Sequence, residues 1–379
     1  MRVTSEFECG NGKNIIEIAP GQFRVEEVGE KAPYCKYFCV RVDGGAEGGV
    51  ARLKIYPDPA LGEPGRIGFI GHYPSQLWMS ESDMQYWQPV DNRRPGSDRF
   101  DEDCIETSVA VPAGQSVYVA SNPVWRYADL LPWAAEKAAQ GAESLPLGNS
   151  FEGRVIPRLH LPATGQAKFR VMILSGQHPS EHCACMCAGG IVDFLLSAHP
   201  EAAALRRVCD VWAVPMINVD GNAHGRNGWD MQDVNQCWDF AGAAGGKAPT
   251  AVEDKLLWPW LANELKPDII FHFHGYMGKR ACVDPPYDGM YTFADPSAVY
   301  PPDRAALYRR ITDVLAWDTP GSSSFVPPPA HDEAMLDWQL ALACGTLSVF
   351  YEINHGYAGV MGSKKRGAEV FRKVMAALG

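Results

Sequence analysis

VMILSGQHPSEH, residues 171–182, joins an apolar, strand-like run to a polar turn and to the start of a helix. Three other apolar runs have the same character, and segments with helical periodicity separate them. We therefore predict strands at 169–175, 210–217, 268–273 and 346–352. Strands that alternate with helices favour an α/β domain with a mostly parallel sheet. The carboxyl ends of such strands lie along one edge, where open α/β sheets bind their ligands.

The helices of this domain are predicted from apolar periodicity and from candidate caps at Asp303 and Ser363, and they cover 181–198, 251–265, 303–316, 333–343 and 363–378. Before about Asn122 the pattern differs. Short strand-like runs, separated by Gly, Pro and Asp, indicate an antiparallel β-sandwich, and they read KYFCVRV, ARLKIY, ETSVAV and SVYVAS. We therefore predict an α/β protein in two domains, an amino-terminal antiparallel β-sandwich at 1–122 and a mixed sheet flanked by helices at 123–379.

Composition and charge narrow the class of protein. The 379 residues are 46% hydrophobic and 21% charged, which is typical of a globular chain with substantial cores. A net charge of -11 and a pI near 5.4 argue against a nucleic-acid partner or an anionic membrane. The sequence has no signal-like segment, no apolar run of membrane-spanning length and an odd number of cysteines, 11, so we expect reduced thiols and a cytoplasmic location.

His178 and Glu181 are three residues apart where a strand passes into a helix, so both side chains can face one point. His274, in FHFHGY, ends another buried strand. Two imidazoles and one carboxylate leave a coordination position open for water, as a catalytic zinc site requires. A lone His-x-x-Glu pair arises readily by chance among ten histidines. The zinc prediction therefore depends on His274 and on a further acid, Glu352 in SVFYEINH, converging on the same sheet edge.

Two other features near these residues receive structural interpretations. His272 lies two residues before His274 in the same strand, and we expect it to point to the opposite face, as a packed or ligand-supporting histidine rather than a ligand. The run CACMC at 183–187 is expected to pack in the core, because no second cysteine pair follows at zinc-site spacing.

The polar segment NVDGNAHGRNGWDMQDVNQCWDF, residues 218–240, offers further candidates. Asp233 could accept a hydrogen bond from a ligand histidine. Arg226 could stabilise charge developing on a carbonyl oxygen, and Asn235 could orient a substrate carboxylate or amide. Each of these side chains could instead cap a turn or be solvated.

These segments resemble the zinc carboxypeptidases in order and context, through HPSE (178–181), NVDG (218–221), DVNQ (233–236), HGY (274–276) and FYEI (350–353). The beginning of the chain is similar to the cytosolic carboxypeptidase branch of that family, through SEFECGN, KYFCVRV and VYVASNPVWRYADL. The resemblance thus spans nearly the whole chain. It implies a zinc-carboxypeptidase-like catalytic domain behind a β-sandwich.

The resemblance also implies a role for each candidate residue. One zinc ion per chain would be held by His178, Glu181 and His274. Glu352 would be the general base, Arg226 the arginine that stabilises the oxyanion, and Asp233 a support for a ligand.

One position departs from the family pattern. Asn235 is followed by Gln236, where the family has an arginine that binds the terminal carboxylate of the substrate. A neutral amide cannot replace a bidentate guanidinium, so we predict atypical substrate recognition. Tyr276, Lys279 and Arg280 are further candidate substrate-binding residues, and the two cations could instead form a solvated loop. The family's catalytic tyrosine has no evident counterpart in SSSFVPPPAHDE, which offers His331.

Three functions stay open from the sequence. The first is a metallopeptidase that removes an amino acid, with glutamate removal as the natural subcase, and the second is a small-molecule amidohydrolase acting on an N-acyl or amide substrate. The third is an inactive zinc-binding scaffold that recognises a partner through the sandwich. The intact ligand set together with Glu352 favours an enzyme that hydrolyses an amide bond.

Overall fold

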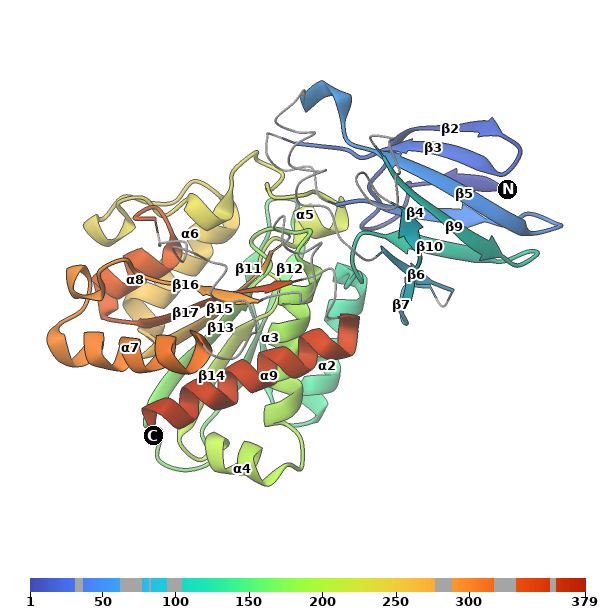
Figure 1. Ribbon diagram of the computed structural model, residues 1–379. Helices are drawn as coiled ribbons and strands as arrows, with labels where there is room; N and C mark the ends of the chain where they lie inside the picture. The colour runs from blue at the N-terminus through green and yellow to red at the C-terminus, as the bar shows by residue number, and fades with distance from the viewer. Residues whose placement is uncertain are drawn as a thin grey trace.

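The computed structural model describes residues 1–30, 37–61, 77–81, 83–93, 104–276, 288–316, 332–354 and 359–379. Its amino-terminal strands form two five-stranded sheets (Figure 1). The first sheet has the strand order β1 (Arg2–Thr4), β4 (Cys39–Asp43), β10 (Ser116–Ala120), β6 (Leu77–Ser80) and β7 (Gln88–Val90). The second has the order β2 (Lys13–Ala19), β3 (Gln22–Glu26), β5 (Gly49–Tyr56), β9 (Ile105–Val111) and β8 (Asn92–Arg93).

The two sheets share one apolar core. Every second residue of β9 is buried, because successive side chains of a strand point to opposite faces. Val40 and Val119 from the first sheet meet Leu53 and Ile55 from the second in a single buried cluster. The predicted β-sandwich is confirmed, with one parallel pair, β3 with β5, among otherwise antiparallel ladders.

The second part of the chain forms a seven-stranded mixed sheet with the order β11 (Glu143–Asn149), β12 (Val155–Leu161), β14 (Cys209–Val214), β13 (Phe169–Ser175), β15 (Ile269–Tyr276), β17 (Leu347–Asn354) and β16 (Gly289–Tyr291). The four predicted strands are its centre and are mutually parallel, while β11, β12 and β16 add antiparallel edges. The sequence did not reveal these edge strands, because β11 contains proline and glycine and is largely exposed.

The helices of the described residues are α2 (Tyr127–Ala139), α3 (His182–Leu195), α4 (Pro200–Arg206), α5 (Val219–Ala223), α6 (Val252–Pro259), α7 (Pro302–Ala316), α8 (Leu336–Cys344) and α9 (Gly359–Leu378). The helix predicted at 251–265 is α6 followed by a π-helical turn at Trp260–Leu265. The last helix begins four residues before the predicted cap Ser363, whose hydroxyl donates to the Gly359 carbonyl within the helix. The fold class is therefore confirmed, and the domain boundary at residue 122 stays a prediction.

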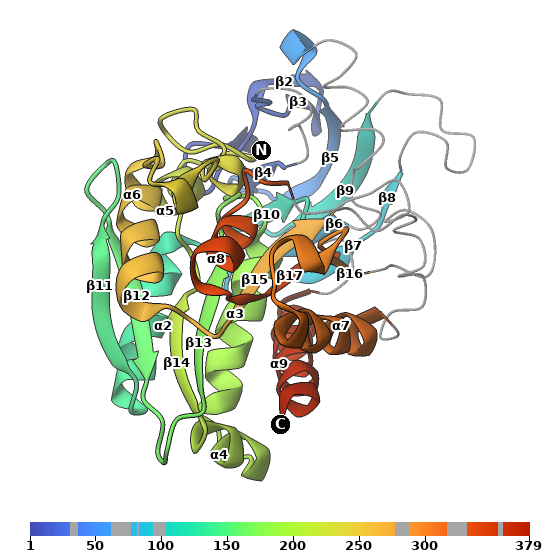
Figure 2. The ribbon, with the colours of Figure 1, turned by 90° about the vertical axis from the view of Figure 1, so that its left-hand side faces the viewer.

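Strand β15 shows which helices cover each face of the sheet. Phe271 packs against Phe371 of α9, with ring centroids 5.0 Å apart. His272 points the other way and contacts Asp337 of α8. Helices α8 and α9 therefore lie on opposite faces of β15, and α3 packs along α9 (Figures 1 and 2).

Helix α3 is buried almost all round, and its three cysteines lie in the core as predicted. Burial raises the pKa of the Cys183 and Cys187 thiols well above the ordinary value, so these thiols are uncharged. In the part of the chain that is described, no single helix has both the length and the apolar character needed to cross a membrane, although α3 and α4 reach those limits as a bent pair.

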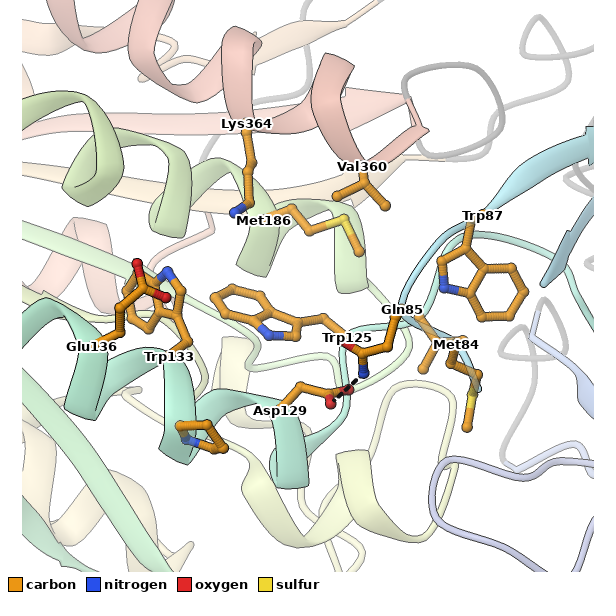
Figure 3. A pocket seen from close by; sticks show the side chains of 12 residues that line it. Met84, Gln85, Trp87, Trp125, Asp129, Trp133, Glu136, Met186, Val360 and Lys364 are labelled. Atoms are coloured by element: carbon orange, nitrogen blue, oxygen red, sulfur yellow. Dashed lines mark hydrogen bonds between the residues drawn. The ribbon is translucent and has the colours of Figure 1, made fainter. Parts of the chain in front are cut away.

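The sandwich contacts the α/β domain through its amino-terminal segment. The amide of Cys9 donates to the Ala223 carbonyl at 2.9 Å, and the Asn11 side chain donates to the Gly225 carbonyl at 2.9 Å. A cavity of about 450 Å³ lies between the β6–β7 hairpin and helices α2, α3 and α9 (Figure 3). Its walls include Trp87, Trp125 and Trp133, and none of the predicted site residues lines it.

Helices α3 and α9 pack at backbone distance. A Cβ atom added to Gly190 of α3 would fall on the backbone of Lys364, and one added to Gly367 of α9 would fall on the backbone of Cys187. We expect Gly190→Ala to lower the free energy of unfolding by about 1–3 kcal/mol, because backbone cannot move aside as a flexible side chain can. Thermal or urea unfolding measures this loss. Gly245→Ala is the control, since nothing lies within 4 Å of its added Cβ, and equal effects of the two changes would contradict this account of the helix contact.

Candidate active site

The predicted site lies where the strand order of the sheet reverses. From β13 the chain moves to β14 on one side and then to β15 on the other, and such a switch point leaves a crevice at the carboxyl ends of the strands. His178 and Glu181 follow β13, and His274 lies near the end of β15. The parallel register pairs His274 directly with Glu352 of β17. The structure therefore brings these predicted residues to one edge.

Three side chains with donor atoms converge at this edge. One carboxylate oxygen of Glu181 lies 2.9 Å from His178 Nδ1, and the other lies 2.9 Å from His274 Nδ1. The two Nδ1 atoms are 3.3 Å apart. The three residues are at most 5% exposed, so this is a buried cluster with one carboxylate and two imidazoles.

The cluster fits a zinc ion. Donors about 2.0–2.2 Å from a tetrahedral zinc ion lie about 3.3–3.6 Å apart, close to the spacing found here. Burial lowers the pKa of His274 to about 3, so its imidazole is neutral and keeps a lone pair for a metal. Two imidazoles that face each other and a carboxylate form a donor set that a divalent cation would satisfy.

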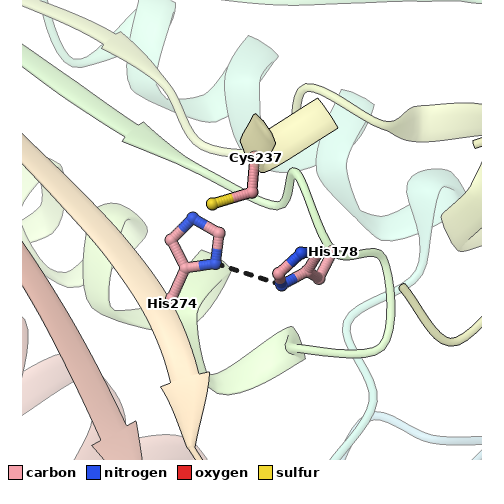
Figure 4. Close-up of side chains that lie close together, drawn as sticks. All are labelled: His178, Cys237 and His274. Carbon is pink, nitrogen blue, oxygen red and sulfur yellow. Dashed lines mark hydrogen bonds between the residues drawn. The ribbon is translucent and has the colours of Figure 1, made fainter. Parts of the chain in front are cut away.

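A cysteine adjoins the cluster and was not predicted. Ligand atoms of Cys237, His178 and His274 all lie within 4.8 Å of one another, so a His-Cys-His set is a second arrangement of donors (Figure 4). Glu181 reaches both imidazoles at 2.9 Å. It therefore stays the predicted third ligand, and Cys237 is the alternative.

The support of His178 differs from the prediction. The side-chain oxygen of Asn235 lies 3.0 Å from His178 Nε2 and also accepts from the Cys237 amide at 3.2 Å. Asp233 instead accepts from Arg226 Nη2 at 2.7 Å, and its side chain is 61% exposed. Asn235 was predicted to contact substrate and Asp233 to support a ligand. In the structure Asn235 takes the supporting contact, because Asp233 has a left-handed backbone and lies out at the surface.

Arg226 is held by a carboxylate of the sandwich that the sequence did not reveal. Glu30 accepts from Arg226 Nε at 2.9 Å and from the amides of Asn227, Gly228 and Trp229 at 2.8, 2.9 and 3.0 Å. Three successive backbone N–H groups around one carboxylate form an anion-binding nest. Glu30 therefore fixes the loop that carries Arg226, and Asp233 takes a second donor of the same guanidinium.

Gln236 is fully buried, and its amide nitrogen donates to Glu253 at 3.1 Å. Burial raises the pKa of Glu253 and of Asp230, because it disfavours the charged form of each carboxyl group. The side chain of Gln236 is thus hydrogen-bonded inside the protein. This contact does not support its predicted role in substrate binding.

The expectation that His272 points away from His274 is wrong. Residues two apart in a strand share a face, so both rings lie on the α8 side of the sheet. Their Nε2 atoms are 3.0 Å apart. Phe350 stacks on His274 with ring centroids 4.5 Å apart. Both contacts restrict the orientation of the ring of His274.

Some predicted residues cannot be placed. Lys279, Arg280 and His331 lie outside the described residues, and so does the side chain of Tyr276. Trp238, which was not predicted, lies beside His178 with ring centroids 5.7 Å apart and is 38% exposed. Trp238 therefore offers an aromatic surface next to the cluster.

Comparison with known proteins agrees with this geometry. A family model described as zinc carboxypeptidase matches residues 130–243, a range that contains His178, Glu181 and the segment with Arg226. No curated protein matches the sequence.

Solved structures show the same fold over the whole chain. A metallo-carboxypeptidase from Pseudomonas aeruginosa, solved in complex with (2-guanidinoethylmercapto)succinic acid, has a TM-score of 0.79 at 17% identity and covers 100% of this chain and 99% of its own. A metallo-carboxypeptidase from Burkholderia cenocepacia has a TM-score of 0.77 at 18% identity, with 100% and 98% covered. The predicted resemblance to the zinc carboxypeptidases is therefore supported by the family model over residues 130–243, and the fold of the metallo-carboxypeptidases is confirmed over the whole chain.

The two donor sets make opposite predictions for zinc binding. We expect Glu181→Gln to weaken zinc binding by more than about 100-fold, exceeding what loss of an outer-shell contact costs, because a neutral amide removes the only charged donor. Cys237→Ser should stay within a few-fold of the unchanged protein. Competition with a chelator measures both constants. If the serine variant loses zinc and the glutamine variant keeps it, the His-Cys-His set is the correct one.

The contact between Glu30 and the nest also has a measurable consequence. In Glu30→Ala, four donors lose their acceptor, so we expect the free energy of unfolding to fall by about 2–3 kcal/mol. Hydrogen exchange of the amides of Asn227, Gly228 and Trp229 should become faster. Glu47→Ala removes an exposed carboxylate of the same domain and is the control. Unchanged exchange at these three amides would show that Glu30 does not order the loop.

Proposed function

We propose that this zinc carboxypeptidase-like chain hydrolyses an amide bond in the cytoplasm, as a metallopeptidase of the cytosolic carboxypeptidase branch with atypical substrate recognition. The observation that carries the proposal is the pairing of His274 with Glu352 in adjacent parallel strands, beside a buried set of three donors. The described cysteines are free and most are buried, which is compatible with a reducing compartment.

Zinc, when bound, lowers the pKa of a coordinated water toward neutrality and polarises the scissile carbonyl. Glu352 is the residue of this chain that handles the proton. It lies on the same face of the sheet as His274, because residues paired in register point the same way, and it is 8% exposed. Its carboxylate accepts the proton of the attacking water and then gives it to the leaving amine.

Arg226 is the candidate for stabilising charge on the substrate's carbonyl oxygen. Its Nε donates to Glu30 and its Nη2 to Asp233, which fixes the plane of the guanidinium. The side chain remains 23% exposed, so part of the group faces outward. A donor held rigidly before the reaction costs no reorganisation when charge develops.

Substrate recognition has two candidate forms. The peptidase form needs a cation for a terminal carboxylate, and Lys279 or Arg280 would supply it for an acidic substrate. The second candidate is a small-molecule amidohydrolase acting on an N-acyl or amide substrate. It is favoured by a specific observation: the amide of Gln236 donates to Glu253, and Arg226 already contacts two carboxylates. Such a substrate needs no terminal-carboxylate clamp.

The base is tested by Glu352→Gln. We expect hydrolysis to fall by about 10²–10⁴-fold, because the amide cannot accept the proton, while zinc content stays near one equivalent. Turnover of a mixed library of peptides and N-acyl amino acids, together with metal analysis, measures both effects. Glu264→Gln changes an exposed glutamate in the same domain and serves as the control.

The substrates that are cleaved then decide between the candidates. Cleavage of peptides that is lost when their carboxyl terminus is amidated supports the peptidase, and preference for N-acyl amino acids supports the amidohydrolase. Activity that survives in Glu352→Gln would refute the proposed base. Zinc binding without cleavage of any library member would favour the third alternative, a zinc-binding scaffold.

A further inference from the structure

We infer that Asp337 and His272 form a positioning relay that fixes the tautomer of the zinc ligand His274. This inference rests on the metal site of the proposed function. The relay runs from helix α8 through strand β15 to the donor cluster, and it uses two residues that do not themselves reach the metal.

The relay is a chain of short contacts. One carboxylate oxygen of Asp337 lies 2.6 Å from His272 Nδ1, and His272 Nε2 lies 3.0 Å from His274 Nε2. His274 Nδ1, on the other side of the ring, faces Glu181 at 2.9 Å. The second oxygen of Asp337 accepts from the Ser348 hydroxyl at 2.6 Å. Asp337, His272, His274 and Ser348 are all 0% exposed.

With a metal ion held by Glu181 and by His274 Nδ1, the chain of contacts allows one arrangement of protons for two neutral imidazoles. A carboxylate can only accept, so His272 Nδ1 must carry a hydrogen and donate it to Asp337. His272 Nε2 then has a lone pair and accepts from His274 Nε2, which must carry the second hydrogen. His274 Nδ1 is left without a hydrogen and points its lone pair at the metal position. The carboxylate of Asp337 thus determines, through the ring of His272, which nitrogen of His274 can bind zinc.

The surroundings keep this arrangement in place. His272 and His274 have no exposed surface, so bulk water cannot exchange protons with the two rings directly. Asp337 lies in the first turn of α8, where the helix dipole favours a negative charge. Phe350 stacks on His274 and limits rotation of the ring.

Replacing the carboxylate with an amide removes the directionality. The amide that Asp337→Asn introduces can donate as well as accept. The hydrogen of His272 can then move from Nδ1 to Nε2, from which it is donated to His274 Nε2. His274 would then carry its hydrogen on Nδ1, which cannot bind zinc in that form. The change preserves size and shape, so packing of α8 against β15 should be retained.

The experiment measures the zinc dissociation constant of the full-length chain by competition with a chelator. We expect Asp337→Asn to bind zinc about 10- to 100-fold more weakly, the loss that outer-shell changes cause. Asp254→Asn is the matched control. Asp254 is also buried, and burial raises the pKa of its carboxyl group well above the ordinary value, which disfavours the charge that an amide would remove. Its zinc affinity should stay within about two-fold of the unchanged protein.

A second pair of variants keeps the inference testable if Asp337→Asn does not fold. In His272→Gln, the side-chain oxygen can accept from His274 and the nitrogen can donate to Asp337, so the direction of both hydrogen bonds survives. His272→Leu preserves neither. We expect the glutamine variant to bind zinc at least about tenfold more tightly than the leucine variant.

The outcomes separate this inference from the proposed function. If the unchanged protein binds no zinc, both fail. If it binds zinc and Asp337→Asn binds it equally tightly, or if the two His272 variants bind equally, the relay is refuted while the metal site stands.

Discussion

The register between β15 and β17 is the constraint on which the site depends. It places His274 beside Glu352 on one face of the sheet. His272 and Phe350, two residues earlier in each strand, form the neighbouring pair on the same face. A slip of one residue would move either set to the opposite face and separate the ligand from the base. Burial of both faces enforces this register, because Phe271 and Phe273 on the other face have no exposed surface. The core packing of the sheet thus determines the chemistry at its edge.

Much of the fold and the donor set could be predicted from sequence because their signals are local. His178 and Glu181 are close in the chain, and His274 and Glu352 follow apolar runs whose ends must meet in a parallel sheet. The missed contacts are of another kind. Glu30 meets its partners from 196 to 199 residues away, and no local pattern shows that pairing. Asp233 and Asn235 are both polar residues of the same loop, so the sequence does not show which of them contacts His178. Only the backbone conformation determines that Asn235 does. The error over His272 came from misapplying the strand period.

Each zinc ligand candidate is supported by a different kind of partner. Asn235 contacts the outer nitrogen of His178, the Gly275 amide donates to Glu181 at 2.8 Å, and His272 contacts the outer nitrogen of His274. These partners come from a loop, from β15 and, through Asp337, from α8. Supporting contacts of this kind hold ligands in place before a metal arrives and raise their affinity. The donor cluster is thus built into the fold rather than assembled by the ion.

The contact between Glu30 and the loop of Arg226 also bears on the order in which parts of the chain fold. It joins two segments separated by nearly 200 residues, and contacts of such long sequence separation form late in folding. The α/β core can collapse around its parallel strands before that contact exists. The loop reaches its final shape only after the sandwich has folded and docked, as expected when domains fold as units. An incompletely folded chain would therefore leave Arg226 unpositioned, and the proposed site would be completed only at the end of folding.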